Sequence, residues 1–479
     1  MIHRPLEETA RALLSSAGSA SLSQLWRVGV TLATHIALRR MIPPSELGPW
    51  YWLEPFFLLL SLFRDLGVPA HVVRDRDRPY GDFLKLQLTW GLAFIAALFV
   101  AAPLLARLYH DPAPPMTAMI RALCAFLVVQ GLGAVPLIYF EAELKVVRTI
   151  PAELVRNLVF AVTALSLAAT GHGIWSPVLA HLAGGTVFAA MLWWAAWPDR
   201  RRGLMPLTFG KVRFWTLAKI GLPLMVMALL EQAVLKLDPL ILALMFSSEV
   251  VGAAGLSVFA VFFFSRLLAD PIGRALYPAL VRYVESPRRA FEAYRSATLL
   301  LASLSTPTCF FLFVNAEAAA LLLGGREWLG AADYLRVLSL VPLVRPFSMF
   351  GLEYLLTRHM DRLLIVYTAA NLVSLGGLGL LLSSGPLGPL GMAAAGYLPL
   401  GMLALAWGLH RLSPEGLGPM TRQLLGLYAA AAVLFLPIAA WVHHPWWRVG
   451  LSCLAGLGVL GYAWRRFGVG ATRFLRGDV

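Results

Sequence analysis

The feature that most constrains this chain is a series of long apolar stretches separated by short polar segments. A helix needs about 20 mostly apolar residues to cross the hydrocarbon core of a membrane. Of the 479 residues, 59% are hydrophobic and only 14% are charged, an excess that a water-soluble core of this size cannot hide. We therefore predict an all-α polytopic membrane protein with about 14 transmembrane helices. The stretches lie near residues 13–38, 47–66, 83–107, 116–140, 150–170, 175–197, 215–246, 251–276, 294–315, 333–357, 361–383, 388–410, 420–442 and 447–465.

The net charge of +14 has two competing explanations, a nucleic-acid surface and the membrane rule that places Lys and Arg in cytoplasmic loops. With fourteen helices both termini lie on one side. Of the 40 Lys and Arg residues, 27 fall in the segments on that side and 5 in the opposite loops. This asymmetry predicts that both termini are cytoplasmic, and nucleic acid is not an expected partner.

The remaining simple signals argue against secretion, metal binding and catalysis. The first apolar stretch is long for a signal peptide, so we expect a retained anchor. The three cysteines are isolated, which is typical of core residues. The largest outside loop, 316–332, carries no catalytic set, and His443 and His444 lack a third metal ligand. No ATP-binding P-loop occurs. We predict that the protein is not an enzyme and holds no cofactor.

Two segments about 200 residues apart are similar to one another. SELG (45–48) and SEVVG (248–252) each precede an apolar helix, an arginine and a PAxVxR or PALVR sequence. This similarity predicts two six-helix bundles of parallel topology. The expected domains are an N-terminal bundle at 1–200, a C-terminal bundle at 201–415, and two additional helices with a cytoplasmic tail at 416–479.

Polar residues in the first apolar stretch recur on one helical face. Gln24, Arg27, Thr31 and His35 follow each other at steps of three or four residues. Such a stripe serves either helix–helix hydrogen bonding or a water-filled cavity, and its arginine favours the cavity.

Other charges within the apolar stretches are expensive to insert into a bilayer, and we therefore interpret them as cavity-lining candidates. Each also has a structural alternative: Asp270 can pair with Arg274 one turn away, Arg64 can extend to the interface, and any carboxylate can simply neutralise a cation. A desolvated carboxylate can also bind H⁺ or Na⁺ and couple transport to an ion gradient. The cationic candidates are Arg64, Lys236, Arg266 and Arg345, and the acidic ion-coupling candidates are Glu54, Glu231, Asp238, Asp270 and Glu353.

Several segments resemble the polysaccharide transporter (Wzx-type flippase) family of the MOP exporter superfamily. The family's opening helix, its following turn and a helix that ends in DLG are matched by the first three segments below. Its loop and helix pair ending in G-x-G-x-W is matched by the next two, and its second-half helix by the last. The matching segments are GSASLSQLWRVGV (18–30), RRMIPPSELGPW (39–50), FRDLGVPAHVVR (63–74), FEAELKVVRTIPAELVRN (140–157), GHGIWSPV (171–178) and KIGLPLMVMALLEQAVLKLDPLILALM (219–245).

This resemblance implies a flippase that carries an undecaprenyl-pyrophosphate-linked oligosaccharide across the bacterial inner membrane, for the synthesis of O-antigen, capsule or exopolysaccharide. A basic central cavity would open alternately to each side, and Arg and Lys would pair with the pyrophosphate. Trp26, Trp50 and Tyr51 are candidates for contact with the sugars. The expected partners are this lipid-linked substrate and membrane lipids, with polysaccharide polymerase machinery as a further candidate.

Three alternatives remain open at this point. A lipid II flippase moves a related lipid with the same number of helices. A MATE-type exporter of drugs or cations belongs to the same superfamily, but the repeated arginines favour an anionic passenger. An O-antigen polymerase or ligase would carry a large outer loop, and the outer loops here are short.

Overall fold

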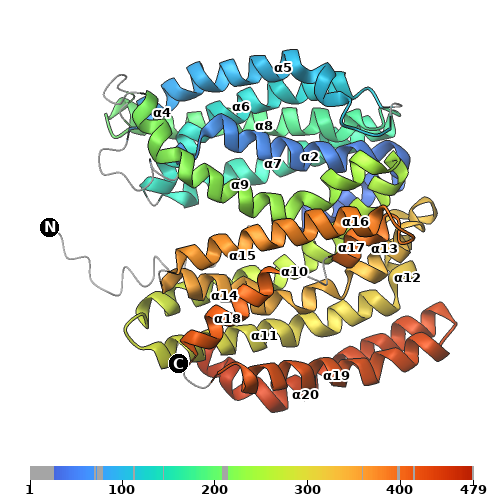
Figure 1. The fold of residues 1–479 in the computed structure, drawn as a ribbon. Coiled ribbons are helices and arrows are strands. Elements are labelled where there is room, and N and C mark those ends of the chain that lie inside the picture. Colours follow the sequence, from blue (N-terminus) through green and yellow to red (C-terminus); the bar gives the residue numbers. More distant parts are fainter. Residues whose placement is uncertain are drawn as a thin grey trace. The chain divides into compact units, whose positions relative to one another are not determined.

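The computed structural model describes residues 26–69, 72, 79–111, 114–143, 145–205, 207, 214–358, 360–395, 400–413 and 416–476. All secondary structure in this described part of the chain is helical (Figure 1). Each of the fourteen predicted apolar stretches contains helix. The prediction of an all-α membrane protein is therefore confirmed.

The chain divides into two compact units. The N-terminal unit comprises Met1–Gln232 and Ala243–Glu249, and the C-terminal unit comprises Ala233–Leu242 and Val250–Val479. The division into two six-helix bundles and two additional helices stays a prediction.

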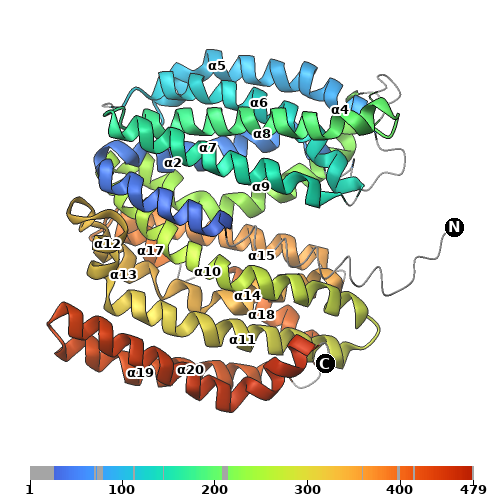
Figure 2. The ribbon, with the colours of Figure 1, turned by 180° about the vertical axis from the view of Figure 1, so that it is seen from behind.

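The N-terminal unit is built from a helix at residues 26–41 and from long helices joined by short turns. These are α2 (Pro44–Asp65), α4 (Tyr80–Leu86), the π-helix η1 (Gln87–Gly91), α5 (Leu92–Ala106), α6 (Met116–Ala142), the 3₁₀ helix η2 (Val146–Thr149), α7 (Ile150–Ala169), α8 (Trp175–Arg201) and the first part of α9 (Phe214–Met245). Helices α6, α7 and α8 pack side by side (Figure 2).

The C-terminal unit contains more breaks. Its elements are α10 (Ser248–Arg282), α11 (Pro287–Val314), α12 (Ala316–Gly324), η3 (Arg326–Trp328), α13 (Ala331–Leu338), η4 (Val341–Leu343), α14 (Arg345–Thr357), α15 (Asp361–Val373), η5 (Ser374–Leu378), α16 (Gly379–Ser383), α17 (Leu390–Ala395), α18 (Gly401–Leu412), α19 (Gly418–Trp441) and α20 (Pro445–Arg476). The last two helices pack together and against α11 (Figure 1).

Within the described residues, eight helices are long and apolar enough to cross a membrane, and a bent pair would make nine. This establishes a multi-pass membrane protein, while the total of fourteen spans stays a prediction. The bent pair corrects the expectation of one continuous helix at 333–357, because the segment Ala331–Leu343, formed by α13 and η4, meets α14 at a bend of 43°. Pro342 lies in η4, just before this break, where it lacks an N–H and its ring would clash with the preceding turn. The loop predicted at 316–332 also contains helices, α12 and η3.

The short turn between α7 and α8 depends on its glycines. Gly171 and Gly173 adopt φ values of 78° and 50°, a region that glycine enters at little cost. The chain therefore reverses within five residues, from Ala169 to Trp175, and α7 lies directly against α8.

A buried carboxylate ties the end of α8 to the connection between α6 and α7. One oxygen of Asp199, Oδ2, accepts hydrogen bonds from the Tyr139 hydroxyl at 2.8 Å, from Lys145 Nζ at 3.1 Å and from Arg148 Nη1 at 2.8 Å. The Tyr139 hydroxyl and then the Asp199 carboxylate hold the pKa of Lys145 above its usual value, so this link persists at neutral pH. This link therefore joins α6, α7 and α8, three of the helices that line the cavity described next.

Candidate functional site

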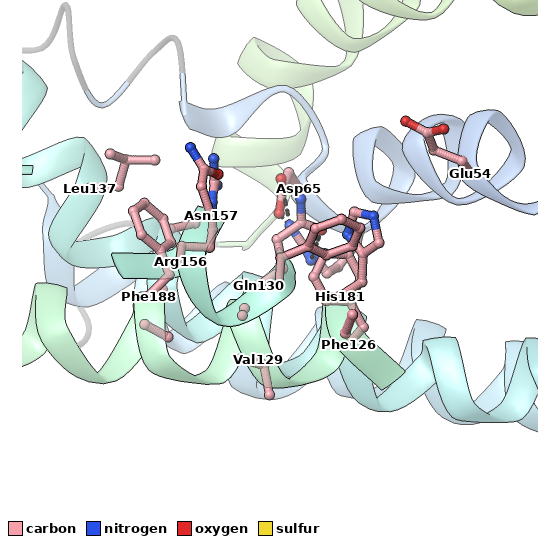
Figure 3. A pocket seen from close by; sticks show the side chains of 18 of the residues that line it. Glu54, Asp65, Phe126, Val129, Gln130, Leu137, Arg156, Asn157, His181 and Phe188 are labelled. Carbon is pink, nitrogen blue, oxygen red and sulfur yellow. Dashed lines mark hydrogen bonds and ion pairs between the residues drawn. The ribbon is translucent and has the colours of Figure 1, made fainter. Parts of the chain in front are cut away.

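A cavity of about 540 Å³ lies inside the N-terminal unit. Its walls come from the helix at residues 26–41, from α2, and from α6, α7 and α8. This volume falls within the range of about 300–1,000 Å³ that is usual for sites that bind small molecules. Figure 3 shows side chains of residues that line it, and they combine aromatic rings with amides and charges.

The aromatic part of the wall is organised around His181 of α8. The indole of Trp50 stacks on its imidazole with ring centres 4.8 Å apart and an angle of 26° between the planes. Phe160 of α7 and Phe126 of α6 meet the same imidazole edge-on, at 4.7 and 5.8 Å. Four helices therefore contribute rings to one aromatic cluster in the cavity wall, in the stacked and edge-to-face arrangements that aromatic pairs prefer.

Arg64, at the end of α2, lies in the cavity wall but is bound on most sides by the protein. Its guanidinium forms two parallel hydrogen bonds to Asp65, from Nε to Oδ1 at 2.8 Å and from Nη2 to Oδ2 at 2.9 Å. Its Nη1 donates to the carbonyl of Leu127 at 2.7 Å and to Gln130 Oε1 at 3.2 Å. Only 1% of Arg64 is exposed. This arrangement joins α2 to α6.

The π-helix η1 brings a further partner to this pair. Gln87, the first residue of η1, donates from Nε2 to Asp65 Oδ1 at 2.8 Å. A glycine faces the same amide from α6, where a Cβ on Gly131 would lie 2.7 Å from Gln87 Oε1. Single π turns often occur at functional positions. Here the turn places a buried amide against an ion pair, and Arg64, Asp65, Gln87 and Gln130 form one polar network, which we call the Arg64 network.

Arg156 and Asn157, neighbours on α7, also line the cavity, and their donors have far fewer partners. The guanidinium carbon of Arg156 lies 4.7 Å from the ring centre of Phe188 on α8. Among the described residues, Arg156 forms no ion pair, and Asn157 Nδ2 is buried without a hydrogen-bond partner. Gly184 makes room for this side chain, because a Cβ there would lie 3.4 Å from Arg156 Cγ.

The predicted site residues of the N-terminal unit are only partly brought together. Thr31 and His35 of the predicted stripe line the cavity, as do Glu54 and Arg64. Arg27 is half-buried and close enough to Arg156 for an electrostatic interaction. Gln24 lies outside the described residues, and so does the side chain of Glu231.

The other predicted site residues belong to the C-terminal unit. Asp238, Asp270, Arg345 and Glu353 are all half-buried there. The guanidinium of Arg345 lies over the ring of Phe262, with its carbon 4.4 Å from the ring centre. Glu353 Oε2 is buried without a hydrogen-bond partner among the described residues. The side chains of Lys236 and Arg266 lie outside the described part.

Sequence reasoning missed Arg156, Asn157 and His181. Arg156 carried the same signal that selected Arg64, since it is a charge inside an apolar stretch, and it could have been found. His181 gave no such signal, because a single histidine on an apolar face is most often a core residue. Within the described residues no group of three or more His, Cys, Asp or Glu side chains could hold a metal ion.

The arrangement of helices defines the class of protein. It is similar to that of "Lipid II flippase MurJ, inward closed conformation", with a TM-score of 0.74 and 12% identity over 93% of this chain and 98% of that chain. An inward-facing "multidrug resistance MATE family transporter of the MOP superfamily" matches with a TM-score of 0.65 and 14% identity over 83% of this chain and 96% of that chain. A MOP superfamily transporter from Pyrococcus furiosus matches with a TM-score of 0.56 and 17% identity over 82% of this chain and 95% of that chain. At these identities the likeness concerns the fold alone, which is that of the MOP transporters.

The sequence assigns the family within that class. Residues 37–333, more than half of the chain, match the family described as "Polysaccharide biosynthesis protein", and the chain belongs to this family. The resemblance predicted from the motifs is thereby confirmed. No curated protein matches the chain.

Proposed function

We propose that the protein is a flippase that carries an undecaprenyl-pyrophosphate-linked oligosaccharide from the cytoplasmic to the outer leaflet of the bacterial inner membrane, with both termini in the cytoplasm. Alternating access would expose the site to one side and then the other. The family supports a role in polysaccharide synthesis, and the fold supports transport. The substrate would be consumed in the synthesis of O-antigen, capsule or exopolysaccharide.

The observation that carries the proposal is the composition of the cavity. The wall holds an aromatic cluster around the stacked Trp50–His181 pair, and the Asn157 amide and the Arg156 guanidinium supply donors with few protein partners. Sugars are bound by this combination, in which apolar faces stack and hydroxyl groups accept hydrogen bonds. A site for an organic cation would instead favour carboxylates and rings without an arginine, whereas this wall combines two exposed carboxylates, Glu54 and Glu141, with the Arg156 guanidinium.

The energy for export would come from an ion gradient or from removal of the flipped product. Asp238 and Glu353 of the C-terminal unit are the candidates for H⁺ or Na⁺ coupling, because both are half-buried carboxyl groups in apolar helices. Asp270 and Glu54 are further candidates. Arg27 and Arg345, both half-buried cations, are candidates for binding the pyrophosphate, together with Lys236 and Arg266.

The test is deletion of the gene in its own host, followed by analysis of the lipid-linked saccharides on the cytoplasmic side of the membrane. We expect the oligosaccharide repeat unit to accumulate and surface polysaccharide to disappear, and restoration of both by the wild-type gene is the control. Reversal of charge by Arg27→Glu should abolish surface polysaccharide while the protein stays in the membrane.

Other outcomes of the deletion would identify a different passenger. Accumulation of lipid II would contradict the assignment to surface polysaccharide. Unchanged lipid pools combined with hypersensitivity to cationic drugs would indicate an exporter instead.

A further inference from the structure

We infer that Arg156 and Asn157 form a subsite for an anionic oxygen group of the passenger, a carboxylate or a phosphate. The inference rests on the proposed function, because it assigns part of the bound molecule to part of the cavity. The two residues are adjacent on α7 and both line the cavity; Arg156 carries a planar guanidinium, and Asn157 carries an amide whose Nδ2 is buried without a hydrogen-bond partner among the described residues. A guanidinium matches the geometry of a carboxylate or a phosphate, whose oxygens accept two parallel hydrogen bonds, and the amide can donate one more.

Charges of both signs lie around this pair. Glu153, one turn earlier on α7, contributes a negative charge, and Arg27 contributes a second positive charge, both within electrostatic reach of Arg156. Glu153 forms no ion pair with Arg156 in the described part of the chain. Figure 3 shows Glu54 on the far side of the picture from Arg156 and Asn157.

The remaining acids of the wall do not compete for these donors. Both oxygens of Asp65 are bound by Arg64. Glu141 is exposed, and it forms no ion pair among the described residues. An incoming anion would therefore find free donors at Arg156 and would not need to displace a protein carboxylate.

The guanidinium is also held in place before any ligand arrives. The face of Phe188 lies 4.7 Å from its carbon, and the stem of the side chain runs past Gly184, where a Cβ would lie 3.4 Å from Arg156 Cγ. A stacked guanidinium keeps its N–H edge available, because the ring occupies only its flat face. Preorganisation of this kind reduces the entropy lost on binding.

Binding to the purified full-length protein in detergent tests the inference with three probes: inorganic pyrophosphate for the carrier lipid, glucuronate for an acidic sugar, and glucose as the neutral control. Calorimetry should show that the wild-type protein binds at least one of the two anions more tightly than glucose. Arg156→Gln should weaken that binding about ten- to hundredfold, and Asn157→Leu should weaken it about tenfold or less.

Arg121→Gln is the matched control, because Arg121 also lies over a phenylalanine ring, that of Phe99 at 4.9 Å, but on an exposed face of α6 outside the cavity. The affinity of the Arg121→Gln variant for the anions should equal that of the wild type. Thermal unfolding of each variant shows whether a loss of binding reflects a loss of fold, and Arg156→Lys, which keeps the charge, should retain part of the affinity.

The probes also separate the two sources of the anion. Binding of pyrophosphate alone assigns the subsite to the lipid carrier, and binding of glucuronate alone assigns it to an acidic sugar. Absence of anion binding in the wild type, or equal affinity in wild type and Arg156→Gln, overturns the inference. If deletion of the gene causes the repeat unit to accumulate while Arg156→Gln supports normal surface polysaccharide, the subsite fails and the flippase stands. If anion binding depends on Arg156 but deletion of the gene leaves the lipid pools unchanged, the subsite stands and the proposed flippase function fails.

Discussion

Arg64 and Arg156 line the same cavity, but the protein surrounds them differently. Arg64 is 1% exposed and donates four hydrogen bonds, two of them to a carboxylate on the next residue. Arg156 is half-buried, contacts a phenylalanine face, and forms no ion pair in the described part of the chain. The first arginine is enclosed by the fold, whereas the second is held by the fold with its donors available.

This contrast separates intramembrane arginines that support the fold from those available to a ligand. Both are costly to insert, so both look functional from the sequence. The cost of Arg64 is offset by groups of the protein itself, and its removal would leave Asp65 without its charge partner. The desolvation cost of the Arg156 guanidinium is offset only partly, because it has no carboxylate partner among the described residues. A ligand that supplies an acceptor to it therefore gains binding free energy.

The largest expected effect is on stability, from replacing Arg64 by a side chain of similar length without charge. Arg64→Met should lower the free energy of unfolding by about 3–5 kcal/mol, because it leaves a largely buried carboxylate unpaired. Arg156→Met should lower it by less than about 1 kcal/mol, since no ion pair is broken. Thermal unfolding of the purified variants, followed by tryptophan fluorescence, measures both. Equal losses of Tm would abolish the distinction between the two arginines.

The helices of the molecule could be predicted from sequence because a bilayer requires long uninterrupted apolar stretches. That rule located helix in all fourteen stretches, including the pair separated only by the turn at Gly171 and Gly173. It could not locate breaks within a stretch, and the bend between α13 and α14 was missed although Pro342 marks it.

The site was predictable only where polar residues recur on a single helix. The helical spacing of Thr31 and His35 pointed correctly to a shared face, and both line the cavity. The aromatic cluster on His181 was not predictable, because its rings come from four helices whose packing is tertiary information. The π turn that brings Gln87 to Asp65 is likewise invisible in a pattern of apolar residues.

An intermediate effect is expected when both members of the buried pair are replaced. The double variant Arg64→Met with Asp65→Leu should be more stable than Arg64→Met alone by at least about 1 kcal/mol, because no unpaired charge remains. It should not reach the wild-type value, since Gln87 and the Leu127 carbonyl lose their partners. The same unfolding experiment gives the coupling free energy. A double variant less stable than the single one would show that Asp65 has another buried partner.

The smallest effect should come from the edge of the Arg64 network. Gln87→Leu removes one hydrogen bond to Asp65 at similar side-chain volume, and it should cost about 1 kcal/mol. Thr89→Val in the same π turn is the matched control, because the Thr89 hydroxyl is exposed and donates only to the Lys85 carbonyl of its own helix, at 2.8 Å. Its Tm should stay close to that of the wild type. If the two variants lose the same Tm, the π turn itself is sensitive to substitution and the amide adds nothing to the ion pair. If only Gln87→Leu lowers Tm, the π turn serves to place that amide against Asp65. The Arg64 network then stabilises the fold on its side of the cavity, and Arg156 is the arginine of the wall that is left to bind a ligand.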